Sequence, residues 1–170
     1  MNKQSILICI ALFCVAMTEA GWAQPKMLVF VRHAEKMEDG TSNPSLSEKG
    51  KQRAVAIQML LEDVKVDQLW STDYHRTRQT IQPLADYFQI PIESYNPANL
   101  KSALDTILQQ NDGKVSVICG HSNTIPIMIN MLIGERRYAN LEEDEYDKIW
   151  VLYPQPEGSP IITLLNMPCP

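Results

Sequence analysis

Cysteine, positive charge and long apolar runs are all scarce in this chain of 170 residues. Its four cysteines have none of the paired spacings typical of zinc sites. The net charge is −5 and no basic stripe is present, so the sequence gives no support to nucleic-acid binding. No apolar run approaches the roughly 20 residues of a membrane-spanning helix. An acidic chain of this kind would bind anions only through a local cluster of positive groups.

The most N-terminal apolar run, residues 6–17, has the layout of a secretory signal peptide. Lys3 precedes it, and small residues follow at positions 20, 21 and 23. We therefore expect residues 1–23 to be removed, with cleavage after Ala20 as the alternative and an uncleaved anchor as the competing interpretation. This predicts a periplasmic or secreted protein with one domain over residues 24–170 and no membrane span.

Two of the four cysteines lie in the predicted signal peptide, which leaves Cys119 and Cys169 in the mature domain. Export would permit a disulfide between them, but their spacing alone does not show whether they meet. We expect Cys119 to be buried in a core strand and Cys169 to be a free cysteine.

Apolar runs of strand length alternate with helical patterns along residues 24–170. Buried strands are predicted at 27–31 and 115–120, because apolar runs of this length are typical of parallel sheets covered on both faces, and a short strand is predicted at 68–71. Ser47 is expected to cap a helix of about fifteen residues. A helix is expected over 74–88, kinked or restarted at Pro83, followed by an edge strand over 90–92. Helices are also expected over 100–109 and 124–133, and the second of these is apolar all round and should be buried. Residues 149–153 and 161–165 should form a closing hairpin. We predict a three-layer α/β/α sandwich with a mostly parallel central sheet.

Arginine or histidine residues follow each of the three predicted strands. Arg32 and His33 come directly after the first, Arg76 lies five residues beyond the second, and His121 follows the last. In open α/β sheets the ligand crevice lies beyond the carboxyl ends of the strands, so we expect these four side chains to surround one site. An unprotonated imidazole can attack phosphorus, and guanidinium groups can hold the phosphoryl oxygens. Ser122 and Asn123 would add backbone N–H groups at the start of the next helix.

These residues fall into three motifs. Arg32-His33-Ala34-Glu35 resembles the Arg-His-Gly signature of the histidine phosphatase superfamily, which includes the cofactor-dependent phosphoglycerate mutases and acid phosphatases. Ser71-Thr72-x-x-x-Arg76-Thr77-x-x-Thr80 is similar to its second arginine motif, and Gly120-His121-Ser122 to its second histidine. Order and spacing agree over about residues 27–152.

This resemblance implies a phosphoglycerate mutase-like fold in which His33 is the nucleophile. Arg32, Arg76 and His121 would then form the phosphate pocket. Ala34 replaces the usual glycine, a small change that leaves room for phosphate.

The larger departure from the family pattern concerns the acid that protonates the leaving group. Many relatives place a glutamate after the third strand, where this chain has only Glu93, in a position that could still belong to the strand. Glu35 is our first candidate, with orientation of Arg32 or of a loop amide as its competing role. The acidic residues at 142–147 are a third candidate, although such a run is usually a solvated loop.

We predict an exported hydrolase that acts on phosphomonoesters through a phosphohistidine intermediate on His33, without a cofactor. A metal site is not expected, because Arg32 and Arg76 would stand beside the cation. The expected partner is a small phosphorylated molecule, whose identity the sequence leaves open together with the oligomeric state. The alternative is a non-catalytic phospholigand-binding domain of the same fold. His75 is expected at the surface and Trp70 in the core.

Overall fold

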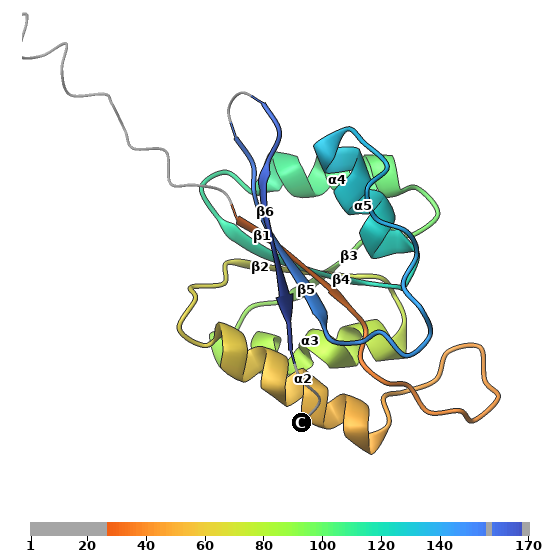
Figure 1. The fold of residues 1–170 in the computed structure, drawn as a ribbon. Coiled ribbons are helices and arrows are strands. Elements are labelled where there is room, and N and C mark those ends of the chain that lie inside the picture. The colour runs from red at the N-terminus through yellow and green to blue at the C-terminus, as the bar shows by residue number, and fades with distance from the viewer. Residues whose placement is uncertain (1–26, 156–157, 168–170) are drawn as a thin grey trace, which may run out of the picture.

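Six strands form a single mixed sheet in the order β3-β2-β4-β1-β5-β6 (Figure 1). The structure is a computed structural model that describes residues 27–155 and 158–167, so the predicted signal peptide and Cys169 lie outside the described residues. Strands β3, β2, β4 and β1 are parallel, whereas β5 is antiparallel to β1 and β6 to β5. The strands are β1 (Met27–Arg32), β2 (Gln68–Ser71), β3 (Ile92–Ser94), β4 (Val115–Gly120), β5 (Lys148–Tyr153) and β6 (Ile161–Asn166).

Helices cover both faces of this sheet in two pairs (Figure 1). Helix α2 (Glu48–Leu61) packs against α3 (His75–Phe88) on one face. Helix α4 (Leu100–Gln110) packs against α5 (Thr124–Ile133) on the other. The predicted three-layer sandwich with a mostly parallel sheet is therefore confirmed. No helix among the described residues is long and apolar enough to cross a membrane.

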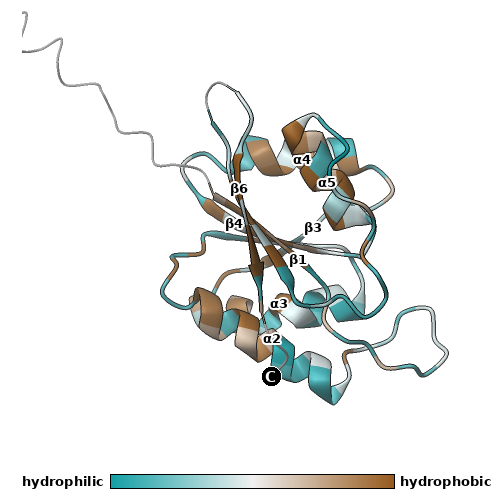
Figure 2. Ribbon diagram, in the orientation of Figure 1, coloured by the Kyte–Doolittle hydropathy of each residue, from teal (hydrophilic) through white to brown (hydrophobic). Residues whose placement is uncertain are grey.

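The central strands are buried on both faces, which explains their continuous apolar sequences (Figure 2). Residues 28–31 of β1 are at most 1% exposed, and successive side chains alternate between two cores. Trp70 and Cys119 are also buried, as predicted. The α4–α5 core includes Leu28, Phe30, Ile107 and Ile125, and the α2–α3 core includes Val29, Val31, Ile57 and Leu84.

The register of the parallel strands aligns their carboxyl ends. Arg32 pairs with Gly120, and Ser71 pairs with Cys119. The His33 N–H also donates to the Gly120 carbonyl at 2.8 Å, which extends this alignment one residue beyond β1. The residues that follow β1, β2 and β4 thus begin at one edge of the sheet.

Three details differ from the predicted elements. Helix α3 does not restart at Pro83, since it runs unbroken from His75 to Phe88, and Ile81 and Leu84 on either side of the proline are fully buried. Strand β3 begins at Ile92 rather than Ile90, because the Ile90 N–H donates to the Ala85 carbonyl and so terminates α3.

The third difference concerns α5, which was expected to be buried all round. Met128 and Ile129 are fully buried, but Ile127 is 38% exposed and Met131 is 46% exposed. The sheet and α4 cover one side of this helix only. The predicted closing hairpin is confirmed, since β5 and β6 pair along their whole length.

Gly50 allows the start of α2 to lie directly on the chain that follows β1. A Cβ atom at this position would lie 2.1 Å from the carbonyl oxygen of Glu35. Helix propensity alone would make Gly50→Ala stabilising by about 1 kcal/mol. We expect the opposite sign, a loss of about 2 kcal/mol of unfolding free energy, because the Glu35 backbone must move. Urea titration measures this change.

Gln52→Ala is the matched control, because Gln52 is exposed on the same helix. Its unfolding free energy should change by less than about 0.5 kcal/mol. A Gly50→Ala variant as stable as the wild type would contradict the close approach of α2 to Glu35.

Candidate active site

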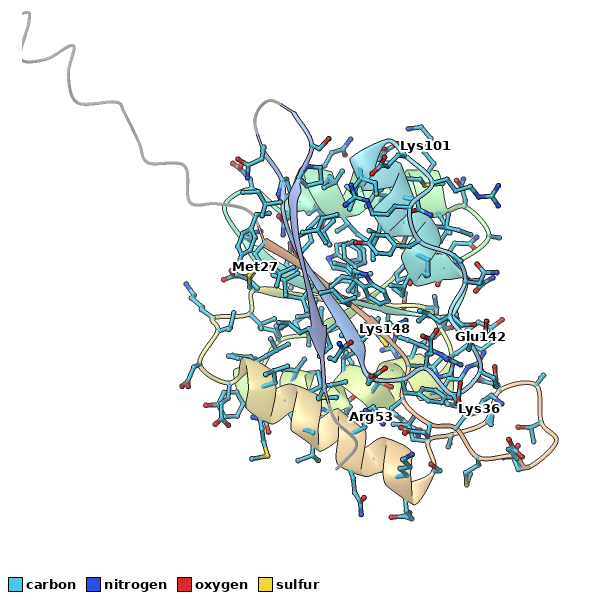
Figure 3. The ribbon with its side chains drawn as sticks, in the orientation of Figure 1. Met27, Lys36, Arg53, Lys101, Glu142 and Lys148 are labelled. Atoms are coloured by element: carbon cyan, nitrogen blue, oxygen red, sulfur yellow. The ribbon has the colours of Figure 1, made fainter. Side chains whose placement is uncertain are left out.

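The structure brings Arg32, His33, Arg76 and His121 together at the carboxyl edge of the sheet. The ring centroids of the two histidines lie 5.5 Å apart in an edge-on arrangement. The charges of Arg32, His121 and Arg76 all act on His33. Figure 3 shows Lys36 and Glu142, which lie beside this region, on the side of the molecule away from Met27 at the start of β1.

His33 has one ring nitrogen fixed by the backbone and the other without such a bond. Its Nδ1 lies 2.8 Å from the Ala34 carbonyl oxygen. Because a carbonyl only accepts, Nδ1 is the donor and the lone pair of the neutral ring is on Nε2. Burial, together with the charges of Arg32, His121 and Arg76, outweighs this hydrogen bond and lowers the pKa of His33 to about 3. His33 is therefore unprotonated at Nε2 near neutral pH, as a nucleophile requires.

The loop that carries His33 is tied to α3 by Thr80. The Ala34 N–H donates to Thr80 Oγ1 at 2.9 Å, and Thr80 Oγ1 donates to the Arg76 carbonyl at 2.6 Å. One buried hydroxyl thus connects the segment after β1 to the segment that carries Arg76.

Arg32 is bound on one side by the acidic segment 142–147. Its Nη1 donates to the carbonyls of Glu142 at 2.6 Å and Glu145 at 2.9 Å, and its Nη2 donates to the Glu143 carbonyl at 3.1 Å. The guanidinium carbon lies 4.0 Å from the ring centroid of Tyr146. The predicted solvated loop is therefore anchored through its backbone, a contact that its acidic composition did not indicate.

Arg76 stacks on an aromatic ring instead of binding carbonyls. Its guanidinium carbon lies 4.5 Å from the ring centroid of Tyr74, which also contacts His121 edge-on at 5.1 Å. Among the described residues, the buried Nε and Nη1 of Arg76 and the buried Nε of Arg32 have no hydrogen-bond partner. Buried charged donors without acceptors are costly, so these three atoms indicate a site for an anion.

His121 and the start of α5 form another wall of this site. His121 Nε2 lies 3.0 Å from Thr72 Oγ1, and burial with the charges of Arg76 and Arg32 lowers the pKa of His121 to about 4. The Ser122 carbonyl accepts from the Leu141 N–H at 3.0 Å. A cleft of about 300 Å³ is lined by Tyr74, Arg76, Pro97, Ala98, His121, Asn123 and Thr124.

Glu35, the first candidate for the proton donor, is held by positive side chains away from this cleft. Arg53 donates to both of its oxygens, at 2.9 and 2.7 Å, and Lys49 lies at 3.3 Å. Although burial raises the pKa of Glu35, the hydrogen bonds from Arg53 lower it to about 2. This geometry does not support the predicted role as acid or an interaction with Arg32. It indicates an ion pair that joins α2 to the segment after β1.

The other two candidate acids differ in position. Glu93 lies exposed in the edge strand β3, and the loop after it places Pro97 and Ala98, which carry no acid, against His121. Glu143 in the acidic segment lies 3.5 Å from both Arg32 and Lys36. A second cleft of about 520 Å³ is lined by Glu35, Lys36, Glu38, Glu142, Glu143, Asp144 and Tyr146.

Sequence reasoning did not single out several side chains of this region. Thr72 lies within the second motif, but the motif does not indicate its contact with His121. Tyr74 and Tyr146 carry no sequence signal beyond being aromatic residues near a motif or an acidic run. His75, by contrast, is exposed as predicted.

Comparisons with known proteins agree with this fold. The family model of the histidine phosphatase superfamily (branch 1) matches residues 28–96. No curated protein sequence matches the chain. Residues 28–96 are therefore similar to the histidine phosphatase superfamily, and this stretch contains the Arg32-His33 and Arg76 motifs.

Solved structures share the fold at low sequence identity. A SixA-type protein from Agrobacterium tumefaciens is 22% identical with a TM-score of 0.63, over 86% of this chain and 99% of that chain. The protein histidine phosphatase SixA in complex with tungstate is 14% identical with a TM-score of 0.65, over 82% and 96%. A phosphoserine phosphatase from Entamoeba histolytica, in complex with 3-phosphoglyceric acid, is 16% identical with a TM-score of 0.67, over 84% and 97%.

The Glu35–Arg53 pair leads to a prediction about stability and pH. The pKa of Glu35 falls from 4.5 to about 2 on folding, so its stabilisation is complete above about pH 4.5 and is lost as the pH falls toward 2. We expect Glu35→Gln to lower the unfolding free energy by about 3 kcal/mol at neutral pH. Urea titration at neutral and acid pH should show the two proteins converging as the pH falls.

Glu48→Gln is the control, because Glu48 is exposed and its ion pair within the described part of the chain is with Lys51 of the same helix. It should change stability by less than about 0.5 kcal/mol. The folded Glu35→Gln protein should keep kcat within about threefold of the wild type. A loss of kcat with stability unchanged would instead support the predicted proton donor.

Proposed function

We propose that this protein hydrolyses phosphomonoesters through a phosphohistidine intermediate on His33. The observation that carries this proposal is the set of three unpartnered guanidinium nitrogens on Arg32 and Arg76 beside an imidazole with a free Nε2. A phosphoryl group supplies the acceptors that these donors lack, and its phosphorus then lies within reach of the nucleophile.

The reaction proceeds in two displacements. His33 Nε2 forms a bond to phosphorus while the bond from phosphorus to the leaving oxygen breaks. Water then attacks the phosphohistidine, which releases inorganic phosphate and restores the lone pair on Nε2. The protein mainly holds the phosphoryl oxygens, and Arg76, Arg32 Nε, His121 and the N–H groups of Ser122 and Asn123 are assigned this role.

The structural similarity to solved phosphatases supports the same proposed activity. The SixA structure that shares this fold is a complex with tungstate, and the Entamoeba histolytica enzyme is a phosphoserine phosphatase. Tungstate is a tetrahedral oxyanion like phosphate. A small phosphorylated molecule is therefore the proposed substrate class.

The acidic segment 142–147 is the proposed source of any proton for the leaving group. Among the described residues, the candidate carboxylate that pairs with Arg32 is that of Glu143, at 3.5 Å. Glu35 is paired with Arg53, and Glu93 is on the sheet edge. Leaving groups that depart as stable anions would need no such acid.

Export is proposed from the signal-like sequence of residues 1–23. N-terminal sequencing of the protein recovered from its native cell would test this, with a mature chain beginning at Gln24 or Gly21 as the expected result. A chain that retains residue 1 in the cytoplasm would contradict it.

The nucleophile is tested by His33→Ala. This variant should lose hydrolysis of a nitrophenyl phosphate by at least about 10⁴-fold, because the covalent step is removed. Rapid acid quenching of the wild type with ³²P-labelled substrate should trap an acid-labile phosphoenzyme that His33→Ala does not form. His75→Ala is the matched control, since His75 is the exposed third histidine, and it should retain full activity.

Turnover by His33→Ala would refute the mechanism. Tungstate binding by the wild type without turnover on any phosphomonoester would favour the alternative, a phospholigand-binding domain. The observation that favours that alternative is that no carboxylate lines the cleft beside His121 within residues 27–155 and 158–167.

The proposed acid is tested by Glu143→Gln and two substrates. We expect the variant to lose about tenfold or more in kcat on phosphoserine, whose alkoxide needs a proton, and less than twofold on a nitrophenyl phosphate. Asp144→Asn, in the same segment, is the control. An equal effect on both substrates would assign Glu143 to binding and not to proton transfer.

A further inference from the structure

Two buried threonines connect His121 to the backbone at the start of α3. Thr72 Oγ1 lies 3.0 Å from His121 Nε2 and 2.9 Å from Thr77 Oγ1. Thr77 Oγ1 lies 3.0 Å from the Thr72 carbonyl oxygen and 2.9 Å from that of Tyr74. Both threonines are 0% exposed, so water does not compete for these hydroxyl groups.

Counting protons gives these hydrogen bonds a direction. Each hydroxyl has one proton, and a carbonyl oxygen only accepts. The single Thr77 proton is therefore directed to the carbonyls of Thr72 and Tyr74 and shared between them, because otherwise both oxygen–oxygen contacts, of 3.0 and 2.9 Å, would contain no proton. The Thr77 oxygen then accepts from the Thr72 hydroxyl. Thr72 has no proton left for His121, so His121 Nε2 donates to Thr72.

We propose that Thr72 and Thr77 are positioning residues that fix the proton of neutral His121 on Nε2 and present an unprotonated Nδ1 to the phosphoryl group. This inference rests on the proposed function, because it concerns the phosphate pocket. A lone pair on Nδ1 repels a dianionic phosphoryl oxygen unless one proton lies between them. Binding of an oxyanion dianion is therefore coupled to uptake of one proton.

The charges around His121 are consistent with this coupling. The charged and titratable groups facing it are Arg32 and His33 at the end of β1, and Tyr74 and Arg76 at the start of α3. Burial and the two arginines keep the free imidazole neutral near pH 7, with a pKa of about 4. A bound dianion offsets both guanidinium charges, and the additional proton is then favourable on Nδ1.

The tautomer can be observed without substrate or turnover. The chain has three histidines, so ¹⁵N spectra of the imidazole nitrogens of the full chain can be assigned with His75→Ala and His33→Ala. We expect His121 to carry its proton on Nε2 and His33 on Nδ1. A His121 protonated on Nδ1 in the free wild type would overturn the proposal, whether or not the protein is a phosphatase.

Thr77→Val provides a sharper test because it leaves Thr72 in place. The Thr72 hydroxyl loses its acceptor and donates to His121 Nε2, so the proton of His121 should move to Nδ1. Thr72→Ser keeps the hydroxyl and should keep the wild-type tautomer, with kcat/KM within about threefold. Thr72→Val should lower kcat/KM about ten- to hundredfold through the loss of this anchor.

Proton uptake is measured with tungstate, a dianion that has no proton of its own near neutral pH. Calorimetry at about pH 8 in buffers of different ionisation enthalpy should give about one proton bound per tungstate for the wild type. Thr77→Val, with Nδ1 already protonated, should take up almost none. Equal uptake by both proteins, or none by the wild type, would overturn the coupling.

Failure of tungstate to bind would overturn the coupling together with the proposed function. The tautomer measurement separates the two, because it needs no ligand.

Discussion

Two guanidinium groups and two imidazoles share one poorly hydrated corner of the sheet, and their mutual repulsion governs the rest of the site. The imidazoles respond by losing their charge, since burial and the arginines lower the pKa of His33 to about 3 and of His121 to about 4. Arginine cannot respond in this way. Among the described residues, the only carboxylate paired with either arginine is the exposed side chain of Glu143. The positive charge that is left is therefore available to an oxyanion, although the chain as a whole is acidic.

Arg32 connects this corner to a segment about 110 residues away in the sequence. The carbonyls of 142, 143 and 145 point inward to its guanidinium, while the carboxylate of Glu143 lies 76% exposed at the mouth. Neutral carbonyls satisfy the donors of Arg32 without cancelling its charge as a carboxylate would. The segment is thus held against Arg32, whose Nε has no hydrogen-bond partner among the described residues.

The sequence predicted the strands that are buried on both faces, because only a continuous apolar run can occupy such a position. Residues 68–71 and 115–120 were placed at their observed bounds. Two predictions were wrong for local reasons. Strand β3 begins later than expected because the Ile90 N–H terminates α3, and α5 is partly exposed because only one of its sides packs against other elements. The convergence of Arg32, His33, Arg76 and His121 was predictable, since parallel strands end at one edge. Their partners were not, because Arg53 and the carbonyls of 142–145 meet Glu35 and Arg32 only through tertiary packing.

The two histidines differ in their hydrogen-bond partner, and the partner determines which ring nitrogen carries the proton. His33 donates from Nδ1 to a carbonyl, which has no proton to return, so its Nε2 is available to a reacting atom in every hydrogen-bond arrangement of the neutral ring. His121 meets a hydroxyl, and Thr72 either donates or accepts according to the direction of the bonds beyond it. The tautomer of His33 suits its proposed role as nucleophile, because Nε2 keeps its lone pair. The proposed tautomer of His121 leaves Nδ1 able to accept a second proton, which suits its proposed role in binding an oxyanion.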